Sequence, residues 1–271
     1  MSSNSSNINT LNSIVKPRNK RLGLNLNDDQ SSIAAPSILK SEIIIIPSVS
    51  QPTWGSYFIF DVRERNCIIS DIIINFNVGV ISGVTSAPTN YPIYVPATFF
   101  LSKVELVINN VTIDTLYPIQ LFTAQQFLND DEDRVLINAM QGAYTSAVHR
   151  NTLATATSNY YIKLRSFYNE TNLPILSDAH NLQIRCYTDT VANAVEKGSG
   201  GGGTSAATIN SASVILKVSK LPAEIAQARL SSMIKSPEHS IFHSVRYSPF
   251  AVASGATNAT IVLTPFVGNI T

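Results

Sequence analysis

The sequence has few charged residues. Asp, Glu, Lys and Arg make up 14% of the 271 residues and the formal net charge is +1, whereas about a quarter of a typical chain is charged. A protein that binds nucleic acid through bulk electrostatics needs a large basic excess, so this class is excluded and we expect no sequence-specific nucleic-acid partner. Asn, Ser and Thr supply most of the polarity. Such a surface suits a protein that packs against copies of itself.

Cysteine and long apolar runs are also scarce. The only cysteines are Cys67 and Cys186, and neither belongs to a Cys-x-x-Cys pair, so we expect free, buried thiols in a reducing compartment. The longest apolar runs, such as 43–46 and 72–74, fall far short of the ~20 residues that cross a bilayer. The opening residues, MSSNSSNINTLNS, lack the basic and apolar regions of a secretory signal, so we expect none.

Residues 1–40 have the composition of a flexible polar arm. Asn and Ser dominate this segment, which cannot bury enough apolar surface to offset the entropy lost on ordering. Its one basic cluster consists of Lys16, Arg18, Lys20 and Arg21. The cluster is either a solvated tail or a contact with anionic lipid headgroups or genome phosphates, at about 1 kcal/mol per cation near a charged membrane.

Residues 41–221 are typical of an all-β domain, because β-branched and aromatic runs alternate with Pro, Gly and Asn. One hairpin is predicted from Val104–Ile108 and Val111–Leu116, with a tight turn at Asn109-Asn110, since Asn tolerates the positive φ that the turn requires. The remaining predicted strands are 41–49, 56–62, 67–81, 159–168, 181–190 and 211–221, and the Pro- and Gly-containing stretch 81–96 is predicted to be a loop.

Two segments have helical patterns. In 118–140, apolar residues recur at helical spacing, Pro118 suits an early helical position, and the acidic run 130–133 precedes a second short helix. The segment Pro222–Lys235 predicts a further helix, with an acidic residue near its start and Lys235 at its end. Roughly eight to ten strands with long connections, together with these helices, predict a jelly-roll β-sandwich with short helical insertions.

Motifs for catalysis or metal binding are missing from the sequence. His239 and His243 are four residues apart, but Pro237 and strand-like sequence argue against a shared helix face. The acidic run has neither the alternation nor the glycine of a calcium loop. The glycine-rich stretch 198–205 has no following Lys-Ser/Thr pair, so it is not a phosphate-binding loop. We therefore expect no enzyme and no cofactor.

An aromatic segment, 54–60, is followed by Arg63 and Arg65. Aromatic rings interleaved with arginines are typical of single-stranded nucleic-acid platforms. Strand alternation, however, places these rings on opposite faces of one strand. Core packing is therefore the better interpretation.

Four segments, taken in order, resemble the major capsid proteins of the double jelly-roll lineage, which includes tectivirus-like phages, adenovirus-like shells, virophages and large DNA viruses. The segment 48–78 resembles the opening strand pair of that lineage, and 103–128 resembles its hairpin, aspartate-containing strand and following helix. The segment 159–189 resembles an aromatic-Ile-x-Leu strand followed by Leu-Pro-Ile and another strand, and 214–247 resembles the strand and linker helix that leave the first jelly roll.

The resemblance implies a structural capsid protein that forms pseudo-hexameric homotrimers within the icosahedral shell of a virion. Its implied partners are neighbouring capsomers, penton and minor capsid proteins, and an internal viral membrane that the arm would contact. The implied domains are the arm 1–40, a jelly roll at 41–221, and a segment 222–271 holding the linker helix and the first strands of a second jelly roll. Because chains of this lineage carry two jelly rolls, we expect this chain to be the first part of a longer protein.

Three alternatives remain open from the sequence. A single jelly roll with a C-terminal extension would suit a penton or minor capsid protein. A receptor- or glycan-binding spike module would present loop aromatics, for which Tyr91, Tyr94 and Tyr168 are the candidates. An enzyme of the cupin kind would need a His/Glu metal set, and the required spacing is missing from the sequence.

Overall fold

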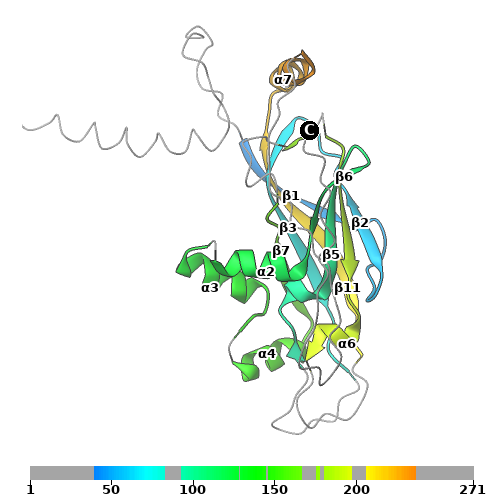
Figure 1. Cartoon of the computed structure of the whole chain (residues 1–271), viewed down its shortest axis with the longest axis vertical. Coiled ribbons are helices and arrows are strands. Elements are labelled where there is room, and N and C mark those ends of the chain that lie inside the picture. The colour runs from blue at the N-terminus through cyan, green and yellow to red at the C-terminus, as the bar shows by residue number, and fades with distance from the viewer. Residues whose placement is uncertain are drawn as a thin grey trace, which may run out of the picture.

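The computed structural model describes residues 40–82, 93–127, 129–144, 146–166, 175–177, 180–196 and 206–235. Its long strands run along the long axis of the molecule, α2, α3 and α4 project from one side, and α7 lies at one end (Figure 1). The strands are β1 (Lys40–Pro47), β2 (Tyr57–Asp61), β3 (Cys67–Val78), β4 (Ile93–Tyr94), β5 (Leu101–Ile108), β6 (Val111–Leu116), β7 (Ser158–Lys163), β8 (Ile175–Leu176), β9 (Leu182–Thr188), β10 (Val195–Glu196) and β11 (Ile209–Lys220). The helices are η1 (Ala97–Phe100), α2 (Pro118–Phe127), α3 (Asp131–Met140), α4 (Ala147–Ala154), α6 (Val191–Ala194) and α7 (Ala223–Lys235).

The strand order identifies the fold. One sheet has the order β1-β11-β3-β7, with β8 beside β3, and the other has the order β2-β9-β5-β6. Every pairing within them is antiparallel. When the two-residue strands are left out and the others are counted along the chain, the two orders become 1-8-3-6 and 2-7-4-5. This winding is that of an eight-stranded jelly roll, so the predicted jelly-roll sandwich is confirmed.

The core lies between the two sheets. Along β3, buried and partly exposed side chains alternate from Ile72 to Val78, and β9 and β11 show the same period. At the centre, the fully buried ring of Phe100 lies edge-to-face with four others at centroid distances from 5.3 to 6.2 Å. These rings belong to Trp54, Phe76, Tyr94 and Tyr160.

The predicted hairpin is present as β5 and β6. Asn109 and Asn110 connect the two strands with φ values of 51° and 66°. Two successive residues in the left-handed region match the twist of the flanking strands, as in a type I′ turn. The hairpin at Asn109-Asn110 is therefore confirmed with its expected boundary.

Helices α2, α3 and α4 form the connection between β6 and β7. A buried polar network ties them to the sandwich: the Thr98 hydroxyl donates to Gln141 Oε1 (2.5 Å), and Gln141 Nε2 donates to Gln125 Oε1 (2.5 Å). Gln125 Nε2 in turn donates to the backbone oxygen of Lys163 on β7 (2.9 Å). All three network side chains are buried, so losing one partner leaves the others unsatisfied away from water. The position of α2 and α3 against β7 is therefore firmly specified.

Helix α7 follows β11 directly. The Leu221 N–H donates to the backbone oxygen of Asn66 (2.7 Å), which fixes the start of the helix to the β2–β3 connection. Ala226 packs with Leu221 and Ile68 in a small apolar cluster. The predicted helix at 222–235 is confirmed, with Pro222 directly before it.

Three local predictions need correction. The stretch 81–96 is not wholly a loop, because Ile93–Tyr94 pairs with β10; two residues are too few to show a strand period. The strand predicted at 159–168 ends at Lys163, and its last residues lie outside the described part of the chain. The helical insertion also continues into α4, whose eight residues AVHRNTLA have little helical periodicity.

Candidate interaction surfaces

Neither a metal site nor a long apolar helix is found in the described part of the chain. No group of three His, Cys, Asp or Glu residues there could hold a metal ion. None of the described helices is long and apolar enough to cross a membrane. His149 on α4 contacts the Tyr144 ring, with 4.0 Å between centroids, whereas His239 and His243 lie outside the described residues. The search for a site therefore turns to surfaces.

Both cysteines are buried, and neither forms a disulfide. Cys186 faces the core from β9, and this burial raises the pKa of its thiol far above the ordinary value. A thiol that stays protonated is a poor nucleophile. The expectation that both cysteines are buried is confirmed.

The aromatic segment divides between the two faces of β2, as alternation predicts. Phe58 and Phe60 point into the core, and Tyr57 points outward, where its ring stacks on Tyr187 of β9 at 5.7 Å. Arg63 beyond the strand pairs with Asp61 at 2.7 Å. A nucleic-acid platform would need several rings on one exposed face, so the core-packing interpretation is confirmed.

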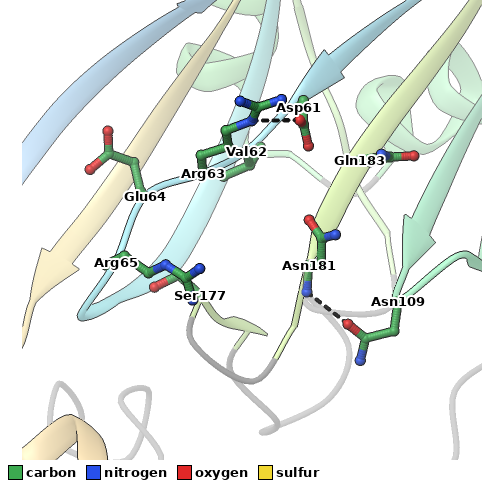
Figure 2. Close-up of a pocket in the computed structure, with 9 residues that line it drawn as sticks. All are labelled: Asp61, Val62, Arg63, Glu64, Arg65, Asn109, Ser177, Asn181 and Gln183. Carbon is green, nitrogen blue, oxygen red and sulfur yellow. Dashed lines mark hydrogen bonds and ion pairs between the residues drawn. The ribbon is translucent and has the colours of Figure 1, made fainter.

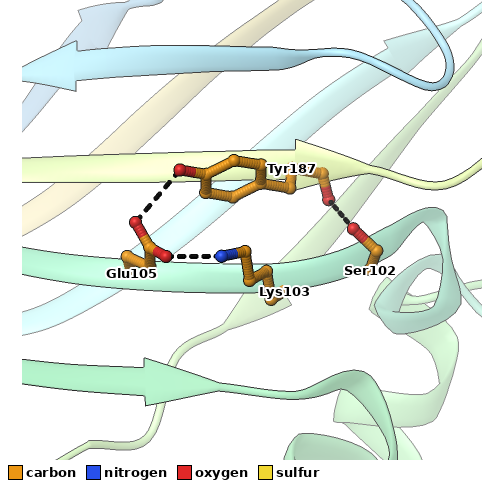
Figure 3. A network of polar contacts seen from close by, with 4 residues as sticks. All are labelled: Ser102, Lys103, Glu105 and Tyr187. Atoms are coloured by element: carbon orange, nitrogen blue, oxygen red, sulfur yellow. Dashed lines mark hydrogen bonds and ion pairs between the residues drawn. The ribbon is translucent and has the colours of Figure 1, made fainter. Parts of the chain in front are cut away.

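The outer face of the sheet β2-β9-β5-β6 carries a compact polar network (Figure 3). Lys103 Nζ lies 2.6 Å from Glu105 Oε1 and 4.2 Å from the centre of the Tyr187 ring. The Tyr187 hydroxyl donates to Glu105 Oε2 (3.1 Å). The hydrogen bond to Glu105 raises the pKa of Lys103, so the lysine is a fixed cation. These contacts tie β5 to β9 and leave no uncompensated charge within the network.

A polar cavity of about 440 Å³ opens where the β2–β3 connection meets the β5–β6 turn (Figure 2). Arg63 pairs with Asp61, and Glu64 pairs with Lys220 at 2.9 Å. Arg65 also lines the cavity, and Asn181 N–H donates to Asn109 Oδ1 (3.0 Å). The lining therefore has two acidic and two basic side chains, so its charge favours neither an anionic nor a cationic ligand.

The outer face of the other sheet carries a row of isoleucines among polar side chains such as Ser213, Lys217 and Asn75. On β1, Ile43 and Ile45 point away from the core and are largely exposed. Ile45 is the register partner of Ile215 on β11, which pairs in turn with Ile73 on β3, so isoleucines form a row across three strands. Sequence reasoning missed this face. The sequence feature that indicates it is the uninterrupted run of isoleucines at 43–46, since a strand with one polar, solvated face should alternate apolar and polar residues.

The acidic run begins α3, as expected. Asp130 is the N-cap residue, and Asp131, Glu132 and Asp133 occupy the first turn, where carboxylates favour the positive end of the helix dipole. Arg134 pairs with Asp131 at 2.7 Å. A solvated helix start, and not a calcium loop, is confirmed.

The sequence-predicted contact residues have different outcomes. Lys16, Arg18, Lys20 and Arg21 lie outside the described residues, as do Tyr91 and Tyr168. The prediction that Tyr94 is an exposed, ligand-binding aromatic is wrong. Tyr94 is buried, and its hydroxyl donates to the backbone oxygen of Gly79 (2.5 Å). Its position in the short strand β4 turns its ring into the aromatic core.

Fold and surfaces together define a jelly-roll protein with a polar network on one outer sheet face and a row of isoleucines on the other. No protein-family model matches the chain, and none of the curated proteins is significantly similar. Among solved structures, the quasi-atomic model of the PBCV-1 virus capsid matches with a TM-score of 0.52 and 20% identity, over 73% of this chain and 46% of that chain. The Faustovirus major capsid protein matches with a TM-score of 0.53 and 9% identity, over 86% of this chain and 66% of that one. The Sputnik virophage structure matches with a TM-score of 0.51 and 11% identity, over 74% and 51%.

The chain thus has the fold of the jelly rolls in these viral capsid proteins. It spans about half the length of the PBCV-1 and Sputnik chains. The resemblance to double jelly-roll capsid proteins that the sequence suggested is confirmed at the level of the fold.

Proposed function

We propose that this chain is a structural component of a virion, a major capsid protein that assembles as pseudo-hexameric trimers into an icosahedral shell. The observation that carries the proposal is the jelly-roll fold, which matches three capsid structures with TM-scores of 0.51 to 0.53. The exposed side chains of Ile43 and Ile45 on the edge strand β1 are consistent with it, because neighbouring exposed apolar side chains favour contact with a partner. Function here is assembly, so the relevant free energy is burial between copies.

The proposal extends to parts of the chain that lie outside the described residues. The arm 1–40 would lie under the shell, and residues 222–271 would contain the linker helix and the first strands of a second jelly roll. The chain covers only about half of its PBCV-1 and Sputnik counterparts, which supports a longer, two-jelly-roll protein. Partners would then be neighbouring capsomers, penton proteins and minor capsid proteins.

Native mass spectrometry on material released gently from its source tests this function. We expect a trimer of chains much heavier than 29.4 kDa, because each chain would carry a second jelly roll. A pentamer of 29.4 kDa chains would contradict the proposal and favour a single jelly-roll penton protein. A monomer of that mass would favour the binding-module alternative.

The arm gives a separate prediction. Deleting residues 1–30 should abolish shells seen by negative-stain electron microscopy while leaving the soluble trimer intact, because the jelly roll itself begins at Lys40. Alanine substitution of the basic cluster Lys16, Arg18, Lys20 and Arg21 should lower cosedimentation with phosphatidylserine vesicles, since about 1 kcal/mol per cation is lost. Substituting Lys103 alone is the matched control, because its charge is already paired with Glu105. Normal shells from the deletion variant would exclude this role for the arm.

A further inference from the structure

We propose that the jelly roll clamps α7 through the β2–β3 connection and the start of β3, and thereby fixes the direction in which the chain leaves the domain. The clamp has three parts: a backbone hydrogen bond from Leu221 to Asn66, an ion pair between Lys220 and Glu64, and an apolar cluster around Ala226. This inference goes beyond the proposed function, because it concerns a single chain and holds with or without assembly.

The connection between β11 and α7 is too short to act as a flexible linker. Strand β11 ends at Lys220 and α7 begins at Ala223, so only Leu221 and Pro222 lie between them. The proline ring holds φ of Pro222 near −65° and also restricts the backbone of Leu221. The Ala226 N–H donates to the backbone oxygen of Pro222 (3.0 Å), so the first helical turn begins at this joint. Few backbone torsions are therefore left about which α7 could swing.

The first anchor lies at the joint itself. The Leu221 N–H donates to the backbone oxygen of Asn66 (2.7 Å), and Asn66 has a φ of 53°, which asparagine tolerates better than most residues. One residue earlier, Lys220 Nζ lies 2.9 Å from Glu64 Oε2. The hydrogen bond to Glu64 raises the pKa of Lys220, so this lysine stays charged at neutral pH. Because the two side chains are 30% and 34% exposed, the ion pair contributes less than the buried contacts.

The second anchor lies along the helix. Ala226 is 1% exposed, whereas the residues on either side of it are exposed. It forms an apolar cluster with Leu221 and with Ile68 of β3, and Met233 packs against the same cluster. Ala226 and Met233 are seven residues apart, which is about 10 Å along a helix axis. A helix that is held at its start and again two turns further on has a fixed direction.

The clamp has a consequence for whatever follows α7. Figure 1 shows α7 at one end of the sandwich, beyond the long strands. A domain attached to the end of a clamped helix is already oriented before copies meet. It therefore loses less conformational freedom on association than a domain on a flexible linker, which favours binding. If the chain continues into a second jelly roll, as the proposed function implies, the first jelly roll orients it.

Displacing α7 tests the clamp. Ala226→Arg should push the helix away, because a long charged side chain does not fit a closely packed apolar contact. Pulsed electron paramagnetic resonance on the whole chain measures the distance between spin labels at Thr112→Cys on β6 and Ser231→Cys on α7, both exposed positions. The native Cys67 and Cys186 are buried and stay unlabelled. We expect one narrow distance distribution without the arginine, and a distribution about twofold wider or more with it.

Ala228→Arg is the matched control. It makes the same change two residues further along α7, at an exposed position, and should leave the distribution narrow. Arginine is a good helix former, so neither variant should shorten α7. Circular dichroism and Trp54 fluorescence show whether the helix and the jelly roll are retained. Dilution of labelled chains into an excess of unlabelled ones restricts the measurement to distances within one chain.

Hydrogen exchange tests the joint without labels. The Leu221 amide should exchange slowly, because its hydrogen bond to Asn66 opens only when the clamp does. In Ala226→Arg it should exchange about tenfold faster or more, and in Ala228→Arg at the original rate. Fast exchange at Leu221 in the unchanged chain would contradict the clamp.

The outcomes separate the clamp from the proposed function. A wide distance distribution in the chain without either arginine, or equal widening by Ala226→Arg and Ala228→Arg, would overturn the clamp and leave a capsid role standing. A narrow distribution in a chain that forms no trimer would support the clamp and overturn the proposed assembly. Loss of trimers in Ala226→Arg alone would support both.

Discussion

Replacing Phe100 by alanine should destabilise the jelly roll by about 3–5 kcal/mol, as expected for a large ring removed from a close-packed core. Phe100 is fully buried at the junction of four other rings, so the cavity is surrounded by side chains from β3, β4, β7 and the β1–β2 connection. Domains of this kind have roughly 5–15 kcal/mol of stability in total, so a large share of it should be lost. Urea unfolding followed by tryptophan fluorescence measures the change, since Trp54 lies 5.4 Å from Phe100.

Phe127→Ala is the matched control for this variant. Phe127 is 81% exposed at the end of α2, so the same chemical change should alter the free energy of unfolding by about 0.5 kcal/mol at most. Both variants should be compared at a concentration at which the chain is monomeric, because association adds to apparent stability. Equal losses for Phe100 and Phe127 would contradict the assignment of the ring cluster as the centre of the core.

Gly142→Ala should be the most damaging small substitution among the described glycines. Gly142 follows α3 with φ = +71°, and an added Cβ would lie 2.6 Å from Cε1 of the buried Tyr160 ring. The left-handed conformation costs alanine roughly 1–2 kcal/mol, and the overpacked ring adds about 1–3 kcal/mol. Thermal unfolding by calorimetry should therefore show a clearly lowered midpoint.

Gly55→Ala separates these two contributions. Gly55 has the same φ of +71°, but the nearest atom to an added Cβ is Thr190 Cγ2 at 4.0 Å. This variant should lose only the backbone share, roughly 1–2 kcal/mol. If Gly142→Ala proves no worse than Gly55→Ala, the Tyr160 ring is free to move and the close approach has no energetic cost.

Local structure could be predicted wherever one short stretch of sequence decides it. The Asn109-Asn110 turn needs two positive φ angles, and asparagine is among the few residues that tolerate them, so the hairpin was placed correctly. Strand alternation likewise placed Phe58 and Phe60 in the core. Both conclusions depend on neighbours within a few residues.

Contacts between distant residues could not be predicted in this way. The network of Thr98, Gln125 and Gln141 joins residues up to 43 positions apart, and each amide alone resembles a surface residue. Tyr94 was misplaced for the same reason, because its burial depends on rings from η1 and β7. The row of isoleucines on the outer sheet face could be recognised only once the register of three strands was known.

The position of β11 between β1 and β3 determines when this sheet can form during synthesis of the chain. Ser41 pairs with Ser219, so this sheet cannot close until nearly all of the jelly roll has left the ribosome. Pairings between residues so distant in sequence form slowly. The row formed by Ile45, Ile215 and Ile73 does not exist before that step. A growing chain therefore cannot present this row of isoleucines on the polysome until β11, which ends at Lys220, has left the ribosome.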